Sequence, residues 1–257
     1  MPTWDSDQYL RFSRERTQPS RDLVARIPLE GAARLLDMGC GPGNSTAELA
    51  ERFGAAGVTG IDNSPQMLAA AREAHPDLRF ISFDMTRDDW SPLGGGYDVV
   101  LSNACIQWLP DHARLLPRML GLLVPGGWLA VQLPLVRRQA MRRILDEASA
   151  MPRWSALLAD VSVPRALEPG DYFDILAPAA SELQIWQTTY YHRMGSLDDV
   201  VEWYRGSSLR PYLRALGERE GDAFVGEVRR RAAEAFAPQP SGGYLLPFPR
   251  LFMLAHR

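Results

Sequence analysis

Residues 35–43 read Leu-Leu-Asp-Met-Gly-Cys-Gly-Pro-Gly, and this stretch decides the fold of the chain. Two apolar residues end a predicted buried strand, the carboxylate of Asp37 lies at its carboxyl end, and a helix opens at about Asn44. The glycines between them are Gly39, Gly41 and Gly43. Glycine permits tight turns and close approach of the backbone to a ligand. Ligands of open α/β sheets bind outside the carboxyl ends of the strands, so we expect a ligand-binding loop here.

The glycine spacing favours a ligand without phosphate groups. Dinucleotide-binding loops read G-x-G-x-x-G and hold a pyrophosphate at the helix N-terminus. Here the spacing is G-x-G-x-G, and Asp37 stands two residues before the first glycine. A carboxylate there repels a pyrophosphate but suits an ammonium group. S-adenosylmethionine, which carries an amino-acid zwitterion, a sulfonium and an adenosine, fits this loop better.

Three further predicted strands, 58–62, 78–85 and 97–104, end in polar residues. The carboxylate of Asp62 can accept both ribose hydroxyls, and Asp84 can accept from the adenine amino group. Asn103 ends the fourth strand. A single Asp or Asn at a strand end is often only a turn residue. The set, in this order, indicates a cofactor site.

The rest of the chain predicts an α/β fold in one domain. Apolar strands alternate with helices up to Pro134, which is typical of a doubly wound, mostly parallel sheet. Other predicted strands are 33–38, 127–133, 182–192 and 243–255, and predicted helices are two within 7–28, then 44–53, 65–74, 112–121 and three within 196–236. We expect a Rossmann-like, seven-stranded sheet with helices on both faces and a helical cap. The core is predicted at 30–135, 180–193 and 243–257, and the cap at 1–29, 136–179 and 194–242.

Composition excludes several classes of protein. The 257 residues carry a net charge of −3 and 46% hydrophobic residues, which gives no sign of nucleic-acid binding. All 28 basic residues are arginine, which excludes Schiff-base lysines and the P-loop lysine. Two cysteines and four histidines show no metal-ligand spacing, so no metal is expected. No signal peptide or membrane span is predicted, and we expect a cytoplasmic monomer.

The glycine loop followed by Gly60-Ile61-Asp62 resembles the class I S-adenosylmethionine-dependent methyltransferases. Nearly the whole chain is similar to one family among them, the trans-aconitate 2-methyltransferases. The matching segments are 4–5, 9–13, 41–46, 107–112, 188–192, 209–211 and 248–252. The resemblance implies a methyl ester formed on a small polycarboxylic acid, trans-aconitate, with S-adenosyl-L-methionine as cofactor and S-adenosyl-L-homocysteine as product.

A carboxylate acceptor is already ionised at neutral pH and needs no general base, so we expect no catalytic residue beyond those that position the reactants. Arg210 and Arg250 lie in matching segments, and a guanidinium binds a carboxylate bidentately. The expected substrate-binding residues are Trp108, Gln132, Arg138, Tyr190, Arg210, Tyr212 and Arg250. Trp108 is alternatively a core residue. His192 is expected to be a hydrogen-bonded strand-end histidine rather than a base.

The expected cofactor site includes more residues than those at the four strand ends. Its residues are Tyr9, Phe12, Arg16, Asp37, Gly39, Gly41, Gly43, Asp62, Asn63, Met67, Asp84, Met85, Asn103, Ala104 and Trp108. Trp4, Tyr9 and Phe12 are apolar enough to predict an N-terminal lid over the cofactor.

One segment departs from the family pattern. After the fifth strand the family typically shows Asp-Asn and then Glu-Pro-Thr-His, whereas this chain has Arg137 and Arg138 within residues 135–141. The departure leaves open a methyltransferase for another acceptor, such as a secondary metabolite or an acyl-carrier carboxylate. A catalytically silent S-adenosylmethionine-binding protein is a further alternative. A nicotinamide oxidoreductase is disfavoured by the glycine spacing.

Overall fold

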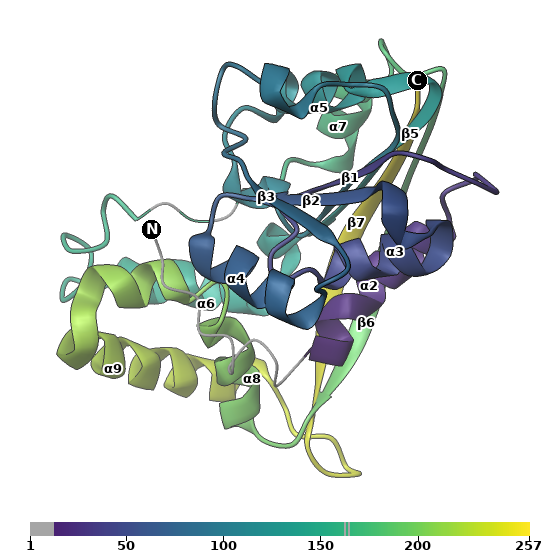
Figure 1. The fold of residues 1–257 in the computed structure, drawn as a ribbon. Helices are drawn as coiled ribbons and strands as arrows, with labels where there is room; N and C mark the ends of the chain where they lie inside the picture. The colour runs from purple at the N-terminus through teal and green to yellow at the C-terminus, as the bar shows by residue number, and fades with distance from the viewer. Residues whose placement is uncertain (1–12, 162, 164) are drawn as a thin grey trace.

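A single seven-stranded sheet organises the computed structural model, which describes residues 13–161, 163 and 165–257. The strand order is β3-β2-β1-β4-β5-β7-β6 (Figure 1). The strands are β1 (Leu35–Met38), β2 (Val58–Asp62), β3 (Arg79–Ser82), β4 (Tyr97–Asn103), β5 (Leu123–Pro134), β6 (Glu182–Met194) and β7 (Tyr244–His256). Strands β1 to β5 pair in parallel, and β7 pairs antiparallel with both β5 and β6. The predicted mostly parallel, seven-stranded sheet is confirmed.

Helices cover both faces of the sheet, and others form a cap. The helices of the described residues are α2 (Ser13–Ala25), α3 (Asn44–Phe53), α4 (Pro65–Ala74), α5 (His112–Gly121), α6 (Ala140–Ser149), α7 (Pro169–Leu176), α8 (Leu197–Arg205) and α9 (Arg210–Ala235). Helices α2 and α3 share one hydrophobic cluster with one sheet face, and α5 and α7 share another with the opposite face. No helix in the described part of the chain is long and apolar enough to cross a membrane.

Local sequence fixes several boundaries where we expected them. Helices α3, α4 and α5 have the predicted bounds. Ser64 caps α4, since its hydroxyl accepts from the amide of Met67, and Pro65 takes the first helical position. Strand β3 is shorter than predicted, because the carboxylate of Asp84 accepts from the amide and hydroxyl of Thr86 and forms a turn there.

Strand β5 is longer than predicted. It begins at Leu123 and runs through the expected turn at residues 125–127. Gly126 has a φ of 86°, and the pairing register with β4 shifts at this place. A glycine in the left-handed region accommodates such an irregularity without ending the strand.

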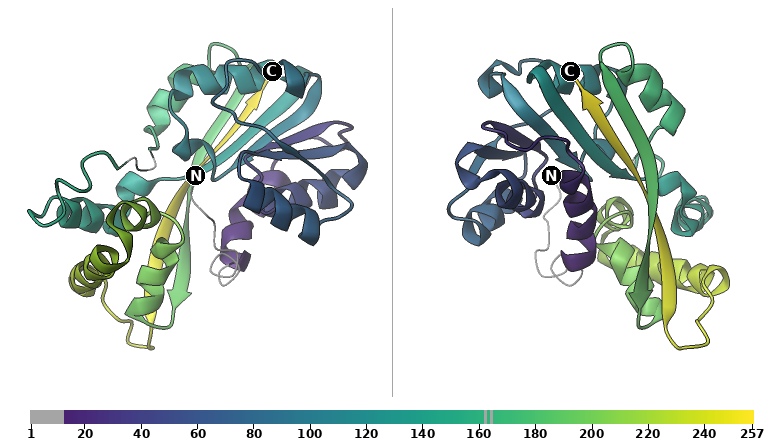
Figure 2. Two further views of the ribbon diagram at one scale, coloured as in Figure 1. Left: turned by 60° about the vertical axis from the view of Figure 1, so that its left-hand side comes forward. Right: turned by 90° about the vertical axis from the view of Figure 1, so that its right-hand side faces the viewer.

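Strands β6 and β7 extend beyond the sheet as a two-stranded ribbon that carries the cap (Figure 2). Pairing of β5 with β7 stops at Arg250, whereas β6 and β7 stay paired to Met194 and Tyr244. A separate hydrophobic cluster joins this ribbon to α6, α8 and α9. These two features support a division into core and cap.

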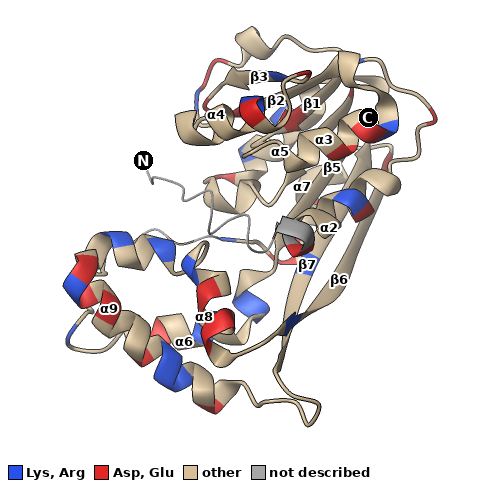
Figure 3. Ribbon diagram, turned by 60° about the horizontal axis from the view of Figure 1, so that its bottom comes forward, with Lys and Arg blue, Asp and Glu red and all other residues tan. Residues whose placement is uncertain are grey.

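The cap is smaller than predicted. Leu23 and Val24 of α2 belong to the cluster on one sheet face, and Tyr172 and Leu176 of α7 belong to the cluster on the other. The structure therefore places these two helices on the sheet, although residues 1–29 and 136–179 were expected in the cap. Gly217, with a φ of 68° and a ψ of −173°, interrupts α9, so residues 196–236 form the three predicted helical segments. Charged residues of both signs lie along α8 and α9 (Figure 3).

We predict that Phe224→Ala destabilises the protein by about 3–5 kcal/mol, the usual cost of deleting a buried phenylalanine. Phe224 is fully buried in the cap, with its ring 5.2 Å from that of Trp154 and 5.5 Å from that of Tyr212. Phe173→Ala is the control, because that side chain is 54% exposed and should change stability by less than about 0.5 kcal/mol. Urea unfolding measures both, and equal losses would contradict the packing described here.

Candidate functional site

One face of the sheet turns from apolar to polar at the carboxyl edge. Leu35, Leu101, Ala130 and Phe252 belong to the cluster beneath α2. Two residues further towards the edge on the same strands, and therefore on the same face, lie polar side chains. They are Asp37 on β1, Asn103 on β4, Gln132 on β5 and Arg250 on β7. Asp62 on β2 lies at the same edge.

The glycine loop lies where the strand order reverses, between β1 and β4, which is the point where ligands bind in open α/β sheets. Gly41 has a φ of 54°, and a Cβ added there would meet nothing within 4 Å. Gly39 has a φ of 79°, and a Cβ added there would overlap the side chain of Cys105. A Cβ added at Gly43 would meet the rings of His75 and Phe80, so among the three loop glycines only Gly41 borders open space. Gly39 is needed for packing against Cys105, and its role in the close approach of a ligand stays a prediction.

Asp37 is fully buried and only half hydrogen-bonded. Its Oδ2 accepts from the hydroxyls of Ser45 and Thr46, each at 2.7 Å. Its Oδ1 has no hydrogen-bond partner. Burial raises the pKa of the carboxyl to about 6, against the opposing effect of the two hydroxyls. A buried carboxylate oxygen without a donor is costly, and a cationic donor would remove that cost.

The carboxylate of Asp62 holds the glycine loop by hydrogen bonds to backbone amides. Its Oδ2 accepts from the amide of Gly41 at 3.0 Å, and its Oδ1 accepts from the amide of Ser64 at 2.8 Å. Burial raises the pKa of Asp62, while these amides oppose the rise. Asn63 is exposed beside it, and Met67 is buried.

Strand β4 ends in a strained turn. The Oδ1 of Asn103 is buried without a hydrogen-bond partner. Ala104 has a φ of 51°, a left-handed value that is uncommon outside glycine, and its amide donates to the carbonyl of Gln132 at 2.8 Å. Such strain clusters at ligand sites. Met85 is buried near Gly39, and Trp108 is 41% exposed, which excludes a core role.

Arg250 is the buried cation of this edge, 5% exposed. One of its Nη atoms donates to Oε1 of Gln132 at 3.3 Å, and the guanidinium carbon lies 4.7 Å from the ring centre of Phe248. The Nε2 of Gln132 is buried without a hydrogen-bond partner. This pair therefore presents donors towards the edge of the sheet.

Two side chains that sequence reasoning did not assign to the site lie near Arg250. His192 packs against Phe248 and Trp203, and burial together with the Arg250 charge lowers its pKa to about 4. Its Nε2 lacks a hydrogen-bond partner, so the expectation of a hydrogen-bonded histidine was wrong at that atom. Tyr204 of α8 is buried, with its hydroxyl also lacking a partner, and burial raises its pKa.

Other predicted substrate residues are engaged elsewhere. The hydroxyl of Tyr190 donates to Asp22 of α2 at 2.5 Å, and Tyr212 stacks on Phe224 in the cap cluster. Arg138 pairs with Glu168 at 2.6 Å. Arg210 opens α9 and is half-buried. The charge of Arg250 nevertheless acts on the Tyr190 hydroxyl, and Arg138 lines the larger of the two cavities described below, so the roles of these four residues in binding the acceptor stay predictions.

Some predictions lie outside the described residues. These are Trp4, Tyr9 and Phe12, and with them the lid that they were expected to form. The backbone of Arg16 belongs to α2, but its side chain is also outside the description. Among the described residues, no group of three or more His, Cys, Asp or Glu is placed to hold a metal ion.

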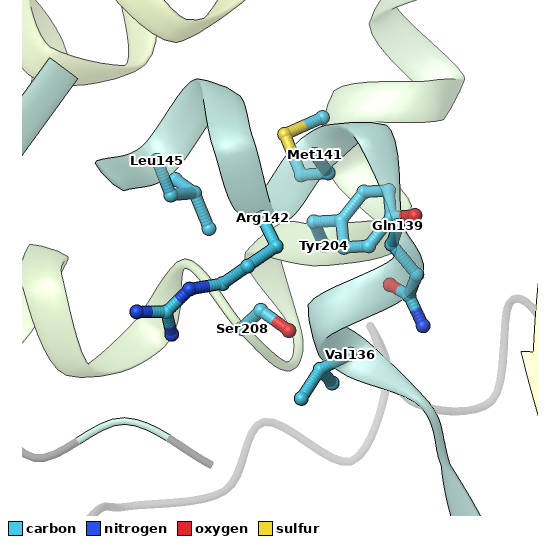
Figure 4. Close-up of a pocket in the computed structure, with 7 residues that line it drawn as sticks. All are labelled: Val136, Gln139, Met141, Arg142, Leu145, Tyr204 and Ser208. Carbon is cyan, nitrogen blue, oxygen red and sulfur yellow. The ribbon is translucent and has the colours of Figure 1, made fainter. Parts of the chain in front are cut away.

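Two cavities lie at the junction of sheet and cap. The smaller one lies between α6 and α8, with Gln139, Tyr204 and Ser208 in its wall (Figure 4). The larger one, of about 250 Å³, opens along β6 and β7 beside Arg138. Gln139 and Tyr204 line both. Neither residue carries a sequence signal for this role, because Tyr204 lies on an ordinary amphipathic helix and Gln139 only precedes one.

Comparisons with known proteins agree with this architecture. A family model described as a methyltransferase domain matches residues 35–127. A protein from Azoarcus sp. named trans-aconitate 2-methyltransferase is 46% identical, over 100% of both chains. Proteins of the same name from Methylobacterium radiotolerans and Escherichia coli are 43% and 42% identical, over 100% of this chain and 99% of theirs.

Two solved structures share the fold at low sequence identity. The YcgJ protein of Bacillus subtilis is 10% identical, with a TM-score of 0.61 over 93% of this chain and 98% of that one. Phosphoethanolamine N-methyltransferase 2 of Haemonchus contortus, solved with S-adenosyl-L-methionine, is 17% identical, with a TM-score of 0.56 over 93% of this chain and 52% of that one.

The two glycines should respond differently to alanine. Gly41→Ala should cost only about 1–2 kcal/mol of stability, because its Cβ enters open space in a left-handed conformation. It should nevertheless weaken binding of S-adenosylhomocysteine at least about tenfold, equivalent to about 1.4 kcal/mol. Gly39→Ala should lower the melting temperature more, because its Cβ overlaps Cys105. Calorimetry and thermal melts separate the two outcomes; unchanged affinity in Gly41→Ala would place the ligand elsewhere.

Asp37 predicts a pH dependence of cofactor binding. With a pKa of about 6, the carboxylate is charged above that pH and becomes protonated below it. Affinity for S-adenosylhomocysteine, whose amino group is cationic, should therefore fall as pH drops through 6, by up to about tenfold per unit. Asp37→Asn should bind more weakly at pH 8 and lose most of this dependence.

The same raised pKa affects stability with the opposite trend. The folded state disfavours the charged carboxyl, so this group lowers the free energy of unfolding as pH rises from its ordinary value of 3.8 through about 6. Without ligand, Asp37→Asn should therefore gain stability relative to the wild type above pH 6. A variant that is less stable at pH 8 would contradict the uncompensated burial of Asp37.

Proposed function

This chain belongs to the trans-aconitate 2-methyltransferase family, and from that premise we propose that it transfers a methyl group from S-adenosylmethionine to a carboxylate of trans-aconitate. The products are a methyl ester and S-adenosylhomocysteine. The observation that carries the proposal is the division of charge along the sheet edge, with carboxylates on β1 and β2 and a buried guanidinium on β7.

The residues of the glycine loop fit the cofactor. The unpartnered Oδ1 of buried Asp37 is suited to an ammonium group, and the open space at Gly41 allows a ligand to approach the backbone. We propose that Asp62 accepts from the ribose hydroxyls. The Oδ1 of Asp84 accepts from the amide of Thr86 in a turn, and we propose that its other oxygen accepts from the adenine amino group. S-adenosylmethionine, when bound, supplies the methyl group on a positively charged sulfur.

The chain's own residues then need only to bind and orient the acceptor. A carboxylate is ionised at neutral pH, so no side chain has to remove a proton. Arg250 can hold one carboxylate by charge-assisted hydrogen bonds, and Gln132 fixes the guanidinium from behind. Low exposure at this edge strengthens these contacts. His192 is neutral at physiological pH and acts as a hydrogen-bonding group rather than as a base.

The segment that departs from the family pattern does not add a cation to this edge. Arg137 is exposed, and Arg138 points to Glu168 and Gln187. The next residue, Gln139, is buried and lines the cavities. The departure is thus compatible with a small acidic acceptor. A cytoplasmic location and a monomeric state remain predictions.

The decisive experiment is a panel of small polycarboxylic acids with radiolabelled S-adenosylmethionine, scored for base-labile methyl ester. We expect trans-aconitate to give the highest kcat/KM. Label transferred only to neutral acceptors or to carrier-bound carboxylates would overturn the proposed acceptor. Binding of S-adenosylhomocysteine without transfer to any acceptor would instead favour a catalytically silent protein.

Arg250→Met should raise KM for trans-aconitate by about 10- to 150-fold, from the loss of a charged hydrogen bond of about 1.5–3 kcal/mol. Affinity for S-adenosylhomocysteine should stay within about twofold, because Arg250 lies on the acceptor half of the edge. Arg193→Met is the matched control, since Arg193 is exposed on the neighbouring strand β6. An unchanged KM in folded Arg250→Met would remove this residue from the acceptor site.

A further inference from the structure

Gln139 and Tyr204 form a shared wall between the two cavities at the junction of sheet and cap. Gln139 precedes α6, and Tyr204 belongs to α8, so the wall joins two elements of the cap. Figure 4 shows both side chains beside the smaller cavity. The larger cavity is also lined by residues of β6 and β7, which are Gln187, Thr189, Leu246, Pro247 and Pro249.

Both side chains carry a buried polar atom that has no hydrogen-bond partner within residues 13–161, 163 and 165–257. Gln139 is 5% exposed and Tyr204 is 1% exposed. The unpartnered atoms are Nε2 of Gln139 and the hydroxyl oxygen of Tyr204. Burying such atoms without partners is costly, and folded proteins rarely retain them without a reason. Two of them on one wall indicate a ligand that supplies the missing partners.

The chemistry of the wall selects an anion. The amide Nε2 can only donate, and burial raises the pKa of Tyr204, which keeps its hydroxyl protonated and able to donate. The positive charge of Arg250 acts on this hydroxyl, so the wall lies within the field of the buried guanidinium. No Asp or Glu is among the described residues that line either cavity. Hydroxyl and amide donors near a guanidinium suit a carboxylate.

The wall is continuous with the acceptor edge of the sheet. Asn103 pairs with Gln132, Gln132 accepts from Arg250, and both Arg250 and Tyr204 pack on Phe248. Packing on Phe248 therefore links the wall to Arg250. A monocarboxylate has no second charged group to place at the wall.

We propose that Gln139 and Tyr204 bind a carboxylate of the acceptor that is not methylated, and so select a polycarboxylate over a monocarboxylate. This assignment rests on the proposed function and adds to it the residues that determine acceptor specificity. Both specificity residues belong to the cap, so the residues that select the acceptor and those that bind the cofactor lie on different parts of the chain.

Calorimetry on protein loaded with S-adenosylhomocysteine tests the assignment. The probes are trans-aconitate, with three carboxylates, and crotonate, a related alkenoic acid with one. Tyr204→Phe and Gln139→Leu should each weaken trans-aconitate binding about tenfold, the effect of losing one hydrogen bond to a charged group. Crotonate binding should change by less than about twofold. Tyr191→Phe is the matched control, because that tyrosine is 63% exposed on β6.

Thermal melts without acid provide a second readout. Removing a buried hydroxyl that has no partner should leave the melting temperature of Tyr204→Phe unchanged or higher. A lower melting temperature would show that the hydroxyl has a structural partner and would overturn the assignment. Wild-type affinity for trans-aconitate in both variants would overturn it as well, as would an equal loss of affinity for both acids.

Activity separates this inference from the proposed function. If the wild type methylates trans-aconitate while both variants retain its KM, the inference fails and the proposed function stands. If the variants lose affinity for the acid but the wild type forms no methyl ester, the wall binds the acid and the proposed function fails.

Discussion

The structure depends on one constraint, the burial of polar side chains where apolar parallel strands end. Six of the strands, β1 to β6, run in the same direction, so their carboxyl ends point to one edge, and β7 brings Arg250 to that edge from the opposite direction. Each strand must be apolar where the helices cover it and polar where it emerges. Asp37 and Gln132 meet this requirement with buried atoms that have no partner among the described residues. The cost of those atoms is the physical sign of a ligand site.

Charge is divided along that edge in a way that matches a two-substrate reaction. The half built from β1, β2 and β3 carries Asp37, Asp62 and Asp84, which suit a cofactor with an ammonium and a sulfonium. The half built from β5 and β7 carries Gln132 and Arg250, which suit an anionic acceptor. The acidic half attracts the cationic cofactor and repels the anionic acceptor, and the basic half does the reverse. Methyl transfer to a carboxylate needs this arrangement more than it needs an acid–base pair.

The cap depends on the two longest strands. Strands β6 and β7 stay paired beyond the point where β7 stops pairing with β5. They therefore project as a ribbon that gives α6, α8 and α9 an apolar surface. Packing on Phe248 connects that surface to the sheet, since Arg250 and Tyr204 both contact its ring. A residue of α8 can therefore act on the same ligand as a residue of the sheet. This connection makes the cap a natural place to determine which acid is accepted.

The sequence by itself determined the fold class and the order of the elements, and it predicted the residues of the cofactor half of the site. Glycine spacing, strand periodicity and helix caps are local signals, and the residues at 37, 41, 62 and 103 follow directly from strand ends. For the acceptor half the sequence predicted Gln132 and Arg250, but only the tertiary structure decided that these two side chains bond to each other. Tyr190 and Tyr212 were predicted to bind the acceptor. In the folded protein the hydroxyl of Tyr190 donates to Asp22, and the ring of Tyr212 stacks on Phe224. Tyr204 and Gln139 come from a helix and a loop that meet the sheet only after the ribbon folds the cap back. Contacts between segments so distant in the chain leave no periodic pattern, because the direction of each side chain depends on packing rather than on its neighbours in sequence.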